Sequence, residues 1–202
     1  MASFGRRDRS APVALRGGLG IPAGACLLGF FGRFMPEKGF LVLLDALERV
    51  AAAGAEAPPH LLAVGSGDFL REYRAEVARR PRLAGRITFR DHLPSVAPQL
   101  PEIDLLVVPS LWEACPLLPM EAMCAGVPVL GSDCIGLREV LRGSPSRMVA
   151  AGDATELAAG IRRAMRAPWT EQARQYAPLA CRRFDVRNAA RDLTLLFDQF
   201  AG

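Results

Sequence analysis

Short apolar runs alternate along this chain with longer segments whose apolar residues recur at helical spacing. The run CLLGFFGRF, from Cys26, precedes a segment in which Phe40, Leu43 and Leu47 recur every three or four residues. Strand-length runs that are apolar without alternation are buried on both faces, and the helices between them supply the cover. The pattern predicts an α/β fold with a Rossmann-like parallel sheet and helices on both faces.

The same alternation continues to the end of the chain. Further strand-like runs begin at Leu61, Arg86, Asp104, Val127 and Arg147. The stretch from about Thr170 to Phe200 is predicted to be a long helical segment. Residues 1–14 show neither period, so we expect a linker or arm there and one Rossmann-like domain over residues 15–202.

Composition excludes several classes of protein. With 202 residues, 50% hydrophobic and 23% charged residues and a net charge of +4, the chain is typical of a globular domain rather than a disordered or collagen-like one. No apolar run approaches the roughly 18 residues of a membrane span, and no signal-peptide core follows the early arginines, which predicts a cytoplasmic location. Five cysteines without a C-x-x-C pair argue against a disulfide framework or a zinc site and predict packed, reduced thiols.

In a parallel sheet of this kind, ligands bind outside the carboxyl ends of the strands. The first predicted strand ends in GRFMPEKG, where Arg33 leaves the strand and Lys38 is expected at the start of the next helix. Two cations beside a helix N-terminus form an anion site that could hold a diphosphate. The alternative is that both residues belong to a solvated surface.

A second candidate loop is LWEACPLLPMEAMCAG. Glu113 lies in the loop, and Glu121, eight residues later, is expected in the first turn of a helix whose first position is Pro119. A carboxylate is a bidentate acceptor for a vicinal diol, and the backbone N–H groups of residues 115–118 offer a second place for phosphate. The alternative for Glu121 is an acid that merely suits the helix dipole.

Other motifs favour neither a dehydrogenase nor a hydrolase. Gly65-Ser66-Gly67 lacks the third glycine of the dinucleotide fingerprint, so Gly65 marks either a close approach to a ligand or a plain turn. The chain has no G-x-S-x-G, P-loop or H-E-x-x-H motif. Arginines after residue 160 could contact an anionic membrane surface or simply favour solubility, and no aromatic interleaving indicates nucleic-acid binding.

In order and spacing, GRFMPEKGFLVLLDAL, LLAVGSGDFLREY, the run from RITFR to VPVLGSD, and GLREVL resemble the C-terminal domain of the retaining glycosyltransferases of GT-B fold called family 4. The resemblance implies that the chain binds a nucleotide-diphosphate sugar, with a UDP-, GDP- or ADP-sugar as donor and with no metal or other cofactor. Arg33 and Lys38 would contact the diphosphate, while Glu113 and Glu121 would be the E-x7-E pair, near the transferred sugar and on the ribose. The backbone around Gly32, Gly65, Leu117 and Leu118 would border the donor, and the 90–93 turn would lie near the base. Ala114-Cys115 and Pro119 depart from the family pattern.

The family's members are about twice this length, with the acceptor site in an N-terminal domain that has no counterpart here. The resemblance therefore implies the donor-binding half of a hexosyltransferase for polysaccharide, lipopolysaccharide or other glycoconjugate synthesis, inactive without an acceptor-binding domain. We expect an excised piece, a truncated product or one half of a split enzyme, with a peripheral contact at the inner face of the membrane as a further expectation. The alternatives are a non-catalytic nucleotide-sugar-binding module and an epimerase-like GT-B protein.

Overall fold

A computed structural model describes residues 14–22, 24–54, 58–166 and 169–200. Its six parallel strands form one sheet in the order β3-β2-β1-β4-β5-β6. They are β1 (Leu27–Phe31), β2 (His60–Val64), β3 (Ile87–Arg90), β4 (Leu105–Val108), β5 (Val129–Ser132) and β6 (Arg147–Val149). The Rossmann-like α/β prediction is confirmed, and most of the expected linker or arm at residues 1–14 lies outside the described residues.

The centre of the sheet is β1, which pairs with β2 on one side and β4 on the other. Leu27 is in register with His60, and Leu28 with both Leu61 and Leu105. The strand order reverses between β1 and β4, which makes this pair the topological switch point of the sheet. The loops that follow β1 and β4 therefore border the crevice where such folds bind ligands.

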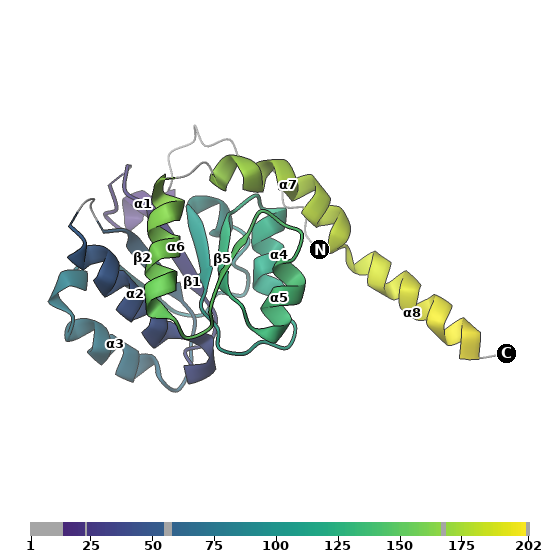
Figure 1. Cartoon of the computed structure of the whole chain (residues 1–202), viewed down its shortest axis with the longest axis horizontal. Helices are drawn as coiled ribbons and strands as arrows, with labels where there is room; N and C mark the ends of the chain where they lie inside the picture. Colours follow the sequence, from purple (N-terminus) through teal and green to yellow (C-terminus); the bar gives the residue numbers. More distant parts are fainter. Residues whose placement is uncertain (1–13, 23, 55–57, 167–168, 201–202) are drawn as a thin grey trace.

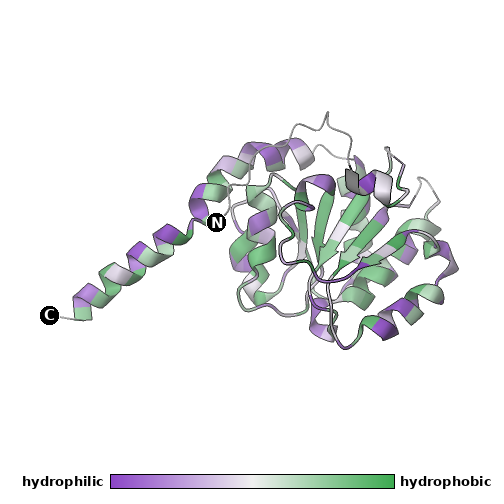
Figure 2. Cartoon of the chain, turned by 180° about the vertical axis from the view of Figure 1, so that it is seen from behind, coloured by the Kyte–Doolittle hydropathy of each residue, from purple (hydrophilic) through white to green (hydrophobic). Residues whose placement is uncertain are grey.

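Helices cover both faces of the sheet (Figure 1). One apolar cluster involves α2 (Phe40–Ala52), α3 (Leu70–Ala78) and α6 (Ala154–Arg166), and the other involves α4 (Leu117–Cys124), α5 (Ile135–Leu141) and α7 (Trp169–Arg183). The remaining helical segments are α1 (Ala14–Gly18), α8 (Val186–Phe200) and the 3-10 turns η1 (Pro36–Lys38), η2 (Pro81–Leu83) and η3 (Leu100–Glu102). Strands β1 and β4 are buried at every residue, and the strands of the sheet are drawn largely in green, the colour of hydrophobic residues, in Figure 2.

A group of aromatic rings anchors the loop after β1. Phe34 is fully buried, and its ring meets that of Phe40 edge-on at 5.4 Å between centroids and 88° between planes. Phe30 and Tyr73 pack against Phe40 at 5.0 and 5.1 Å. The rings bury a large apolar area in a fixed geometry, so their packing fixes the position of the backbone between residues 30 and 40.

A buried arginine ties the start of the domain to the sheet. Arg16 of α1 donates to the carbonyl of Ala25 at 2.7 Å and to Asp104 Oδ2 at 2.6 Å. Asp104 Oδ2 also accepts the N–H of Leu27 at 2.8 Å. This contact lies at the amino ends of β1 and β4, the edge opposite to the strand-end loops, so its role is in stability.

The C-terminal stretch is helical, as the sequence predicted, but it is not one continuous helix. It forms α7 and α8, separated at residues 184–185. Helix α8 has no buried residue and projects from the domain (Figure 1). None of the helices within the described part of the chain combines the length with the apolar content of a membrane-spanning segment.

The cysteines are free, and one part of their prediction is wrong. Cys124 and Cys134 are buried as expected, but Cys115 and Cys181 are exposed. Burial raises the pKa of the Cys124 thiol to about 12, with a further contribution from the neighbouring Cys181. Periodicity did not reveal that Cys115 lies in an open strand-end loop.

Candidate functional site

A cavity of about 290 Å³ lies at the carboxyl ends of β1 and β4, the switch point of the sheet. Residues from the loop after β1, the loop after β4 and the start of α4 line it. The sequence-predicted residues among them are Gly32, Arg33, Lys38, Glu113, Leu117 and Leu118. The structure thus brings together six of the eight predicted site residues, and Gly65 and Glu121 lie outside this lining.

The loop after β1 is held close to the loop after β4. Gly39 has φ 68°, and a Cβ there would lie 2.0 Å from the carbonyl oxygen of Pro109. The N–H of Leu111 donates to the carbonyl of Glu37 at 2.8 Å. Lys38 is the last residue of η1, two residues before α2, so the predicted position at the start of the helix is wrong by one short turn.

Lys38 and Glu113 form an ion pair at the cavity wall. Lys38 Nζ lies 2.8 Å from Glu113 Oε1 and 2.9 Å from Oε2. Their side chains are 22% and 12% exposed, so water and salt weaken the attraction between the two charges less than they would for a surface pair. Neither spacing nor charge pattern predicted this contact, because 75 residues separate the partners.

The second cation, Arg33, is exposed at the same cavity. Glu113 balances the charge of Lys38, so Arg33 contributes the positive charge that this pair does not cancel. An anion entering the cavity would therefore meet an ammonium already fixed in place and a guanidinium with wide freedom of movement.

Helix α4 starts two residues earlier than the sequence predicted. It begins at Leu117, with Pro116 as its N-cap, so Pro119 is its third residue. A proline there removes no intrahelical hydrogen bond, since the first N–H groups of a helix have no partner within it. These groups, at Leu117 and Leu118, lie on the cavity wall and carry the positive end of the helix dipole.

Glu121 consequently falls in the second turn of α4, not the first. It is half-buried, and burial raises the pKa of its carboxyl above the ordinary value of 4.5. The dipole explanation is weakened by this position, because the favourable effect on an acid is confined to the first turn.

Gly65 marks a close approach of the chain to itself. It has φ 155°, and a Cβ there would lie 1.8 Å from the carbonyl oxygen of Gly32. Its N–H donates to the carbonyl of Arg90 at 3.0 Å, while the N–H of Gly32 donates to Val64 at 3.0 Å. Gly65 thus allows the carboxyl ends of β1, β2 and β3 to approach one another beside Gly32, which lines the cavity.

Two site residues were missed at the sequence level: Ser110 and Ser132, both buried. Ser110 donates to Glu113 Oε1 at 2.7 Å, and Ser132 donates to the carbonyl of Ser110. No sequence pattern singles out these two serines. Lys38, by contrast, stands out in the composition as well, since it is the only lysine among the 25 lysine and arginine residues of the sequence.

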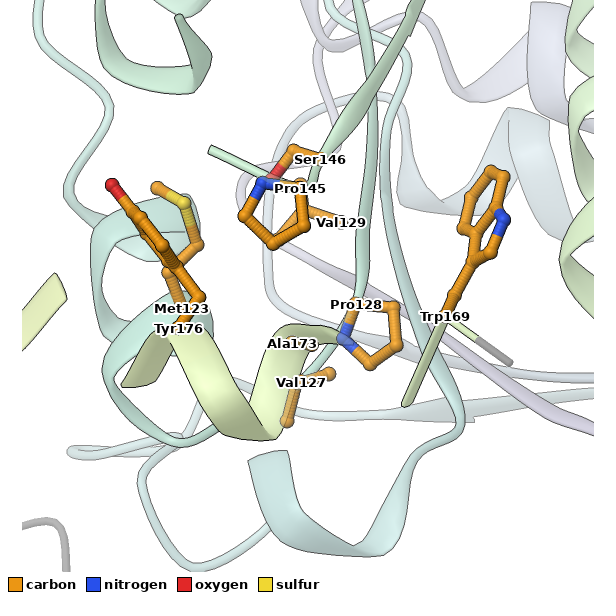
Figure 3. Close-up of a pocket in the computed structure, with 9 residues that line it drawn as sticks. All are labelled: Met123, Val127, Pro128, Val129, Pro145, Ser146, Trp169, Ala173 and Tyr176. Carbon is orange, nitrogen blue, oxygen red and sulfur yellow. The ribbon is translucent and has the colours of Figure 1, made fainter. Parts of the chain in front are cut away.

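Two other hollows fit a ligand less well. The one in Figure 3, between α4, the start of β5 and α7, holds only about 10 Å³, room for one water, and has no ionisable side chain apart from Tyr176. A hollow of about 510 Å³ beside β6 is lined by Arg147, Arg163 and Arg166, but it lies on the edge strand and away from the switch point.

Residues 25–167 match the family model described as glycosyl transferases group 1. The chain belongs to this family. It is 37% identical over 142 residues to 2-deoxystreptamine N-acetyl-D-glucosaminyltransferase of Streptomyces fradiae. The aligned region covers 69% of this chain and 34% of that glycosyltransferase. The chain is 31% identical over 134 residues to the lipopolysaccharide core biosynthesis mannosyltransferase LpsB of Rhizobium meliloti, covering 62% of this chain and 36% of the relative.

Two solved structures share the fold. HepE of Anabaena, in complex with UDP-glucose, superimposes with a TM-score of 0.85 at 23% identity, covering 97% of this chain and 54% of HepE. WaaG, a glycosyltransferase involved in lipopolysaccharide biosynthesis, gives a TM-score of 0.72 at 23% identity, covering 85% of this chain and 48% of WaaG. The chain thus spans about a third of the first curated relatives and about half of these structures.

Proposed function

We propose that this chain is the donor-binding half of a retaining hexosyltransferase, with a nucleotide-diphosphate sugar in the cavity at the ends of β1 and β4. The observation that carries the proposal is the convergence of Arg33, Lys38 and the N-terminus of α4 on that one cavity. All three favour a diphosphate, through charge-assisted hydrogen bonds or unpaired N–H groups.

The chemistry proposed for these groups is stabilisation of the leaving group. When the bond between the sugar and the diphosphate breaks, negative charge grows on the phosphate oxygens while the sugar becomes oxocarbenium-like. Cations fixed beside the phosphates before the reaction lower the barrier, because they need no reorganisation as the charge develops. Lys38, held by Glu113, has this property in the structure.

We infer different roles for the two glutamates of the site, Glu113 and Glu121. We infer that Glu121 accepts hydroxyl groups of the ribose, a role that suits a half-buried carboxylate whose pKa is raised by burial. Glu113 is bound by Lys38 and Ser110, so its first role is to hold the ammonium; the expected contact with the transferred sugar would use its remaining lone pairs.

The acceptor and the site that binds it are proposed to lie in an N-terminal domain, since the chain spans only about a third of its first curated relatives. A role in glycoconjugate or polysaccharide synthesis is proposed because LpsB and WaaG are both described as enzymes of lipopolysaccharide biosynthesis. The cytoplasmic location and the peripheral membrane contact stay predictions.

The test is calorimetric titration of the chain with UDP, GDP and ADP and with their sugars. UDP comes first, because HepE is solved with UDP and with UDP-glucose. One nucleotide diphosphate is expected to bind, and Lys38→Ala and Glu121→Ala are each expected to weaken it by about 1–3 kcal/mol. Arg79→Ala, at an exposed surface ion pair, is the matched control. Failure of a folded sample to bind any of them would refute the donor site, and sugar transfer by the chain alone would refute the need for a second domain.

A further inference from the structure

A chain of buried polar contacts joins three strand-end loops at the wall of the cavity. Ser132, the last residue of β5, donates its hydroxyl to the carbonyl of Ser110 in the loop after β4. The hydroxyl of Ser110 in turn donates to Glu113 Oε1 at 2.7 Å. The two serines are 2% and 1% exposed, so water does not replace these bonds.

Glu113 is the point where the contacts meet. Its two carboxylate oxygens bind Lys38 Nζ, from the loop after β1, at 2.8 and 2.9 Å. Its backbone is fixed from a third side by α5, since a Cβ on Gly136 would lie 2.5 Å from the Glu113 carbonyl oxygen. The carboxylate is therefore held by one charged partner, Lys38, and by one uncharged partner, Ser110.

We propose that Ser110 and Ser132 are positioning residues for the Glu113 carboxylate. Glu113 in turn fixes the Lys38 ammonium where the diphosphate is proposed to bind, beside Arg33 and the N-terminus of α4. The proposal rests on the proposed function. An ammonium on a flexible four-carbon stem loses rotamer entropy when a ligand immobilises it. A carboxylate that has already immobilised it removes this cost from the binding step.

The arrangement also explains why this cation is a lysine in a chain whose other 24 basic residues are arginines. An ammonium is compact and has three N–H donors, so it can bind both Glu113 oxygens and still offer a donor to a phosphate. A planar guanidinium would pair with the carboxylate as a fork and point its remaining donors elsewhere. Lys38→Arg is therefore expected to behave like a loss of function despite its conserved charge.

The first test reads the position of Lys38 without any ligand. Because the chain has a single lysine, a ¹⁵N-labelled sample has one side-chain ammonium signal. We expect a detectable, slowly exchanging signal in the free protein, a faster exchange in Ser110→Ala and in Ser132→Ala, and loss of the signal in Glu113→Gln. The matched control is Ser144→Ala, which removes a hydroxyl bonded to the carbonyl of Leu141 at 2.7 Å, outside the cavity.

Two outcomes would overturn the proposal. One is a signal that Ser110→Ala and Ser132→Ala leave unchanged while their backbone spectra remain those of the folded protein. The other is the absence of the signal from the unsubstituted chain, which would mean that Glu113 does not hold Lys38. If one serine variant fails to fold, the other still decides the result, since the two hydroxyls act in series.

The second test measures UDP affinity in a double-mutant cycle. Ser110→Ala is expected to weaken UDP binding by about 3–10-fold, and to cause no further loss when Glu113→Gln is already present. Additive losses would show that Ser110 acts by another route and would overturn the proposal. A chain that binds no nucleotide would refute the proposed function alone, because the ammonium signal still decides whether the serines position Lys38.

Discussion

The loops at the carboxyl ends of β1 and β4 differ sharply from helix α8, although both carry large apolar side chains. In the loops, Phe34 is fully buried and Glu113 is 9% exposed. On α8, Phe197 is 68% exposed and Phe200 is 81% exposed, on a helix whose apolar residues recur at helical spacing. Phe34 has its packing partners within the domain, whereas no residue of α8 is buried against the described part of the chain.

This difference separates what the domain needs for its own stability from what it does not. Burial contributes to the free energy of unfolding only where a side chain leaves water on folding, and that holds for the aromatic group beneath the loops. The α8 side chains stay in water, so their substitution tests the contrast directly.

Removal of the Phe34 ring should cause the largest loss. Phe34→Ala is expected to lower the free energy of unfolding by about 3–5 kcal/mol, because the ring is fully buried among Phe30, Phe40 and Phe89. Phe197→Ala on α8 is the matched control, with an expected change within about 0.5 kcal/mol. Urea unfolding followed by circular dichroism measures both, and equal losses would contradict the contrast.

The next effect concerns the contact between the two loops. Gly39→Ala is expected to cost roughly 2–4 kcal/mol, since the new methyl group would meet the Pro109 carbonyl oxygen in addition to the strain of a positive φ. Gly54→Ala is the control: Gly54 has φ 66° and open space around its Cβ position, so the strain alone should cost about 1–2 kcal/mol. Similar losses in the two variants would mean that the loops are not in close contact.

A smaller effect should appear in the pH dependence of stability. Burial raises the folded-state pKa of Glu121, so the folded protein keeps that proton longer than the unfolded chain as the pH rises. Stability from this group therefore falls as the pH rises from about 4.5 through the folded-state pKa. Glu121→Gln should remove this fall. Compared with the unsubstituted chain, the variant should therefore gain stability as the pH rises from acid to neutral.

The measurement is the thermal midpoint from about pH 4 to pH 7, with exposed Glu72 replaced by glutamine as the control. A Glu121→Gln profile that runs parallel to that of the unsubstituted chain would contradict the burial of this carboxylate.

The smallest effect is expected at α8. A chain that ends at Asp185 should unfold at the same temperature as the full chain, within about 1–2 °C, because no α8 residue is buried. Calorimetric scans of the two chains measure the difference. A large drop would show that α8 has partners within the domain and that the contrast with the loops is false.

The elements themselves were largely predictable. The apolar runs at Leu61, Asp104 and Val127 became β2, β4 and β5, because a strand covered on both faces must be apolar throughout. The ends of helices were less predictable. Pro119 suggested the first position of α4, but a proline fits anywhere in the first turn, so the true start at Leu117 was missed.

The site was predicted as a set of residues but not as a set of contacts. Arg33, Lys38 and Glu113 were expected near one crevice, and they line one cavity. The ion pair between Lys38 and Glu113 and the hydroxyl of Ser110 were not expected. A serine in a strand-end loop has no sequence signature, since its role depends on which carboxylate lies opposite its hydroxyl.

Periodicity and composition are local properties, and they were enough to predict the fold class, the strand-end loops and the types of charge that those loops carry. The packing of the strands and helices decides that Glu113 binds Lys38 and Ser110, that Ser132 binds Ser110, and that α8 buries no residue against the described part of the chain. The physical reason is that these contacts join residues tens of positions apart, and their distances and burial depend on how the strands and helices pack together.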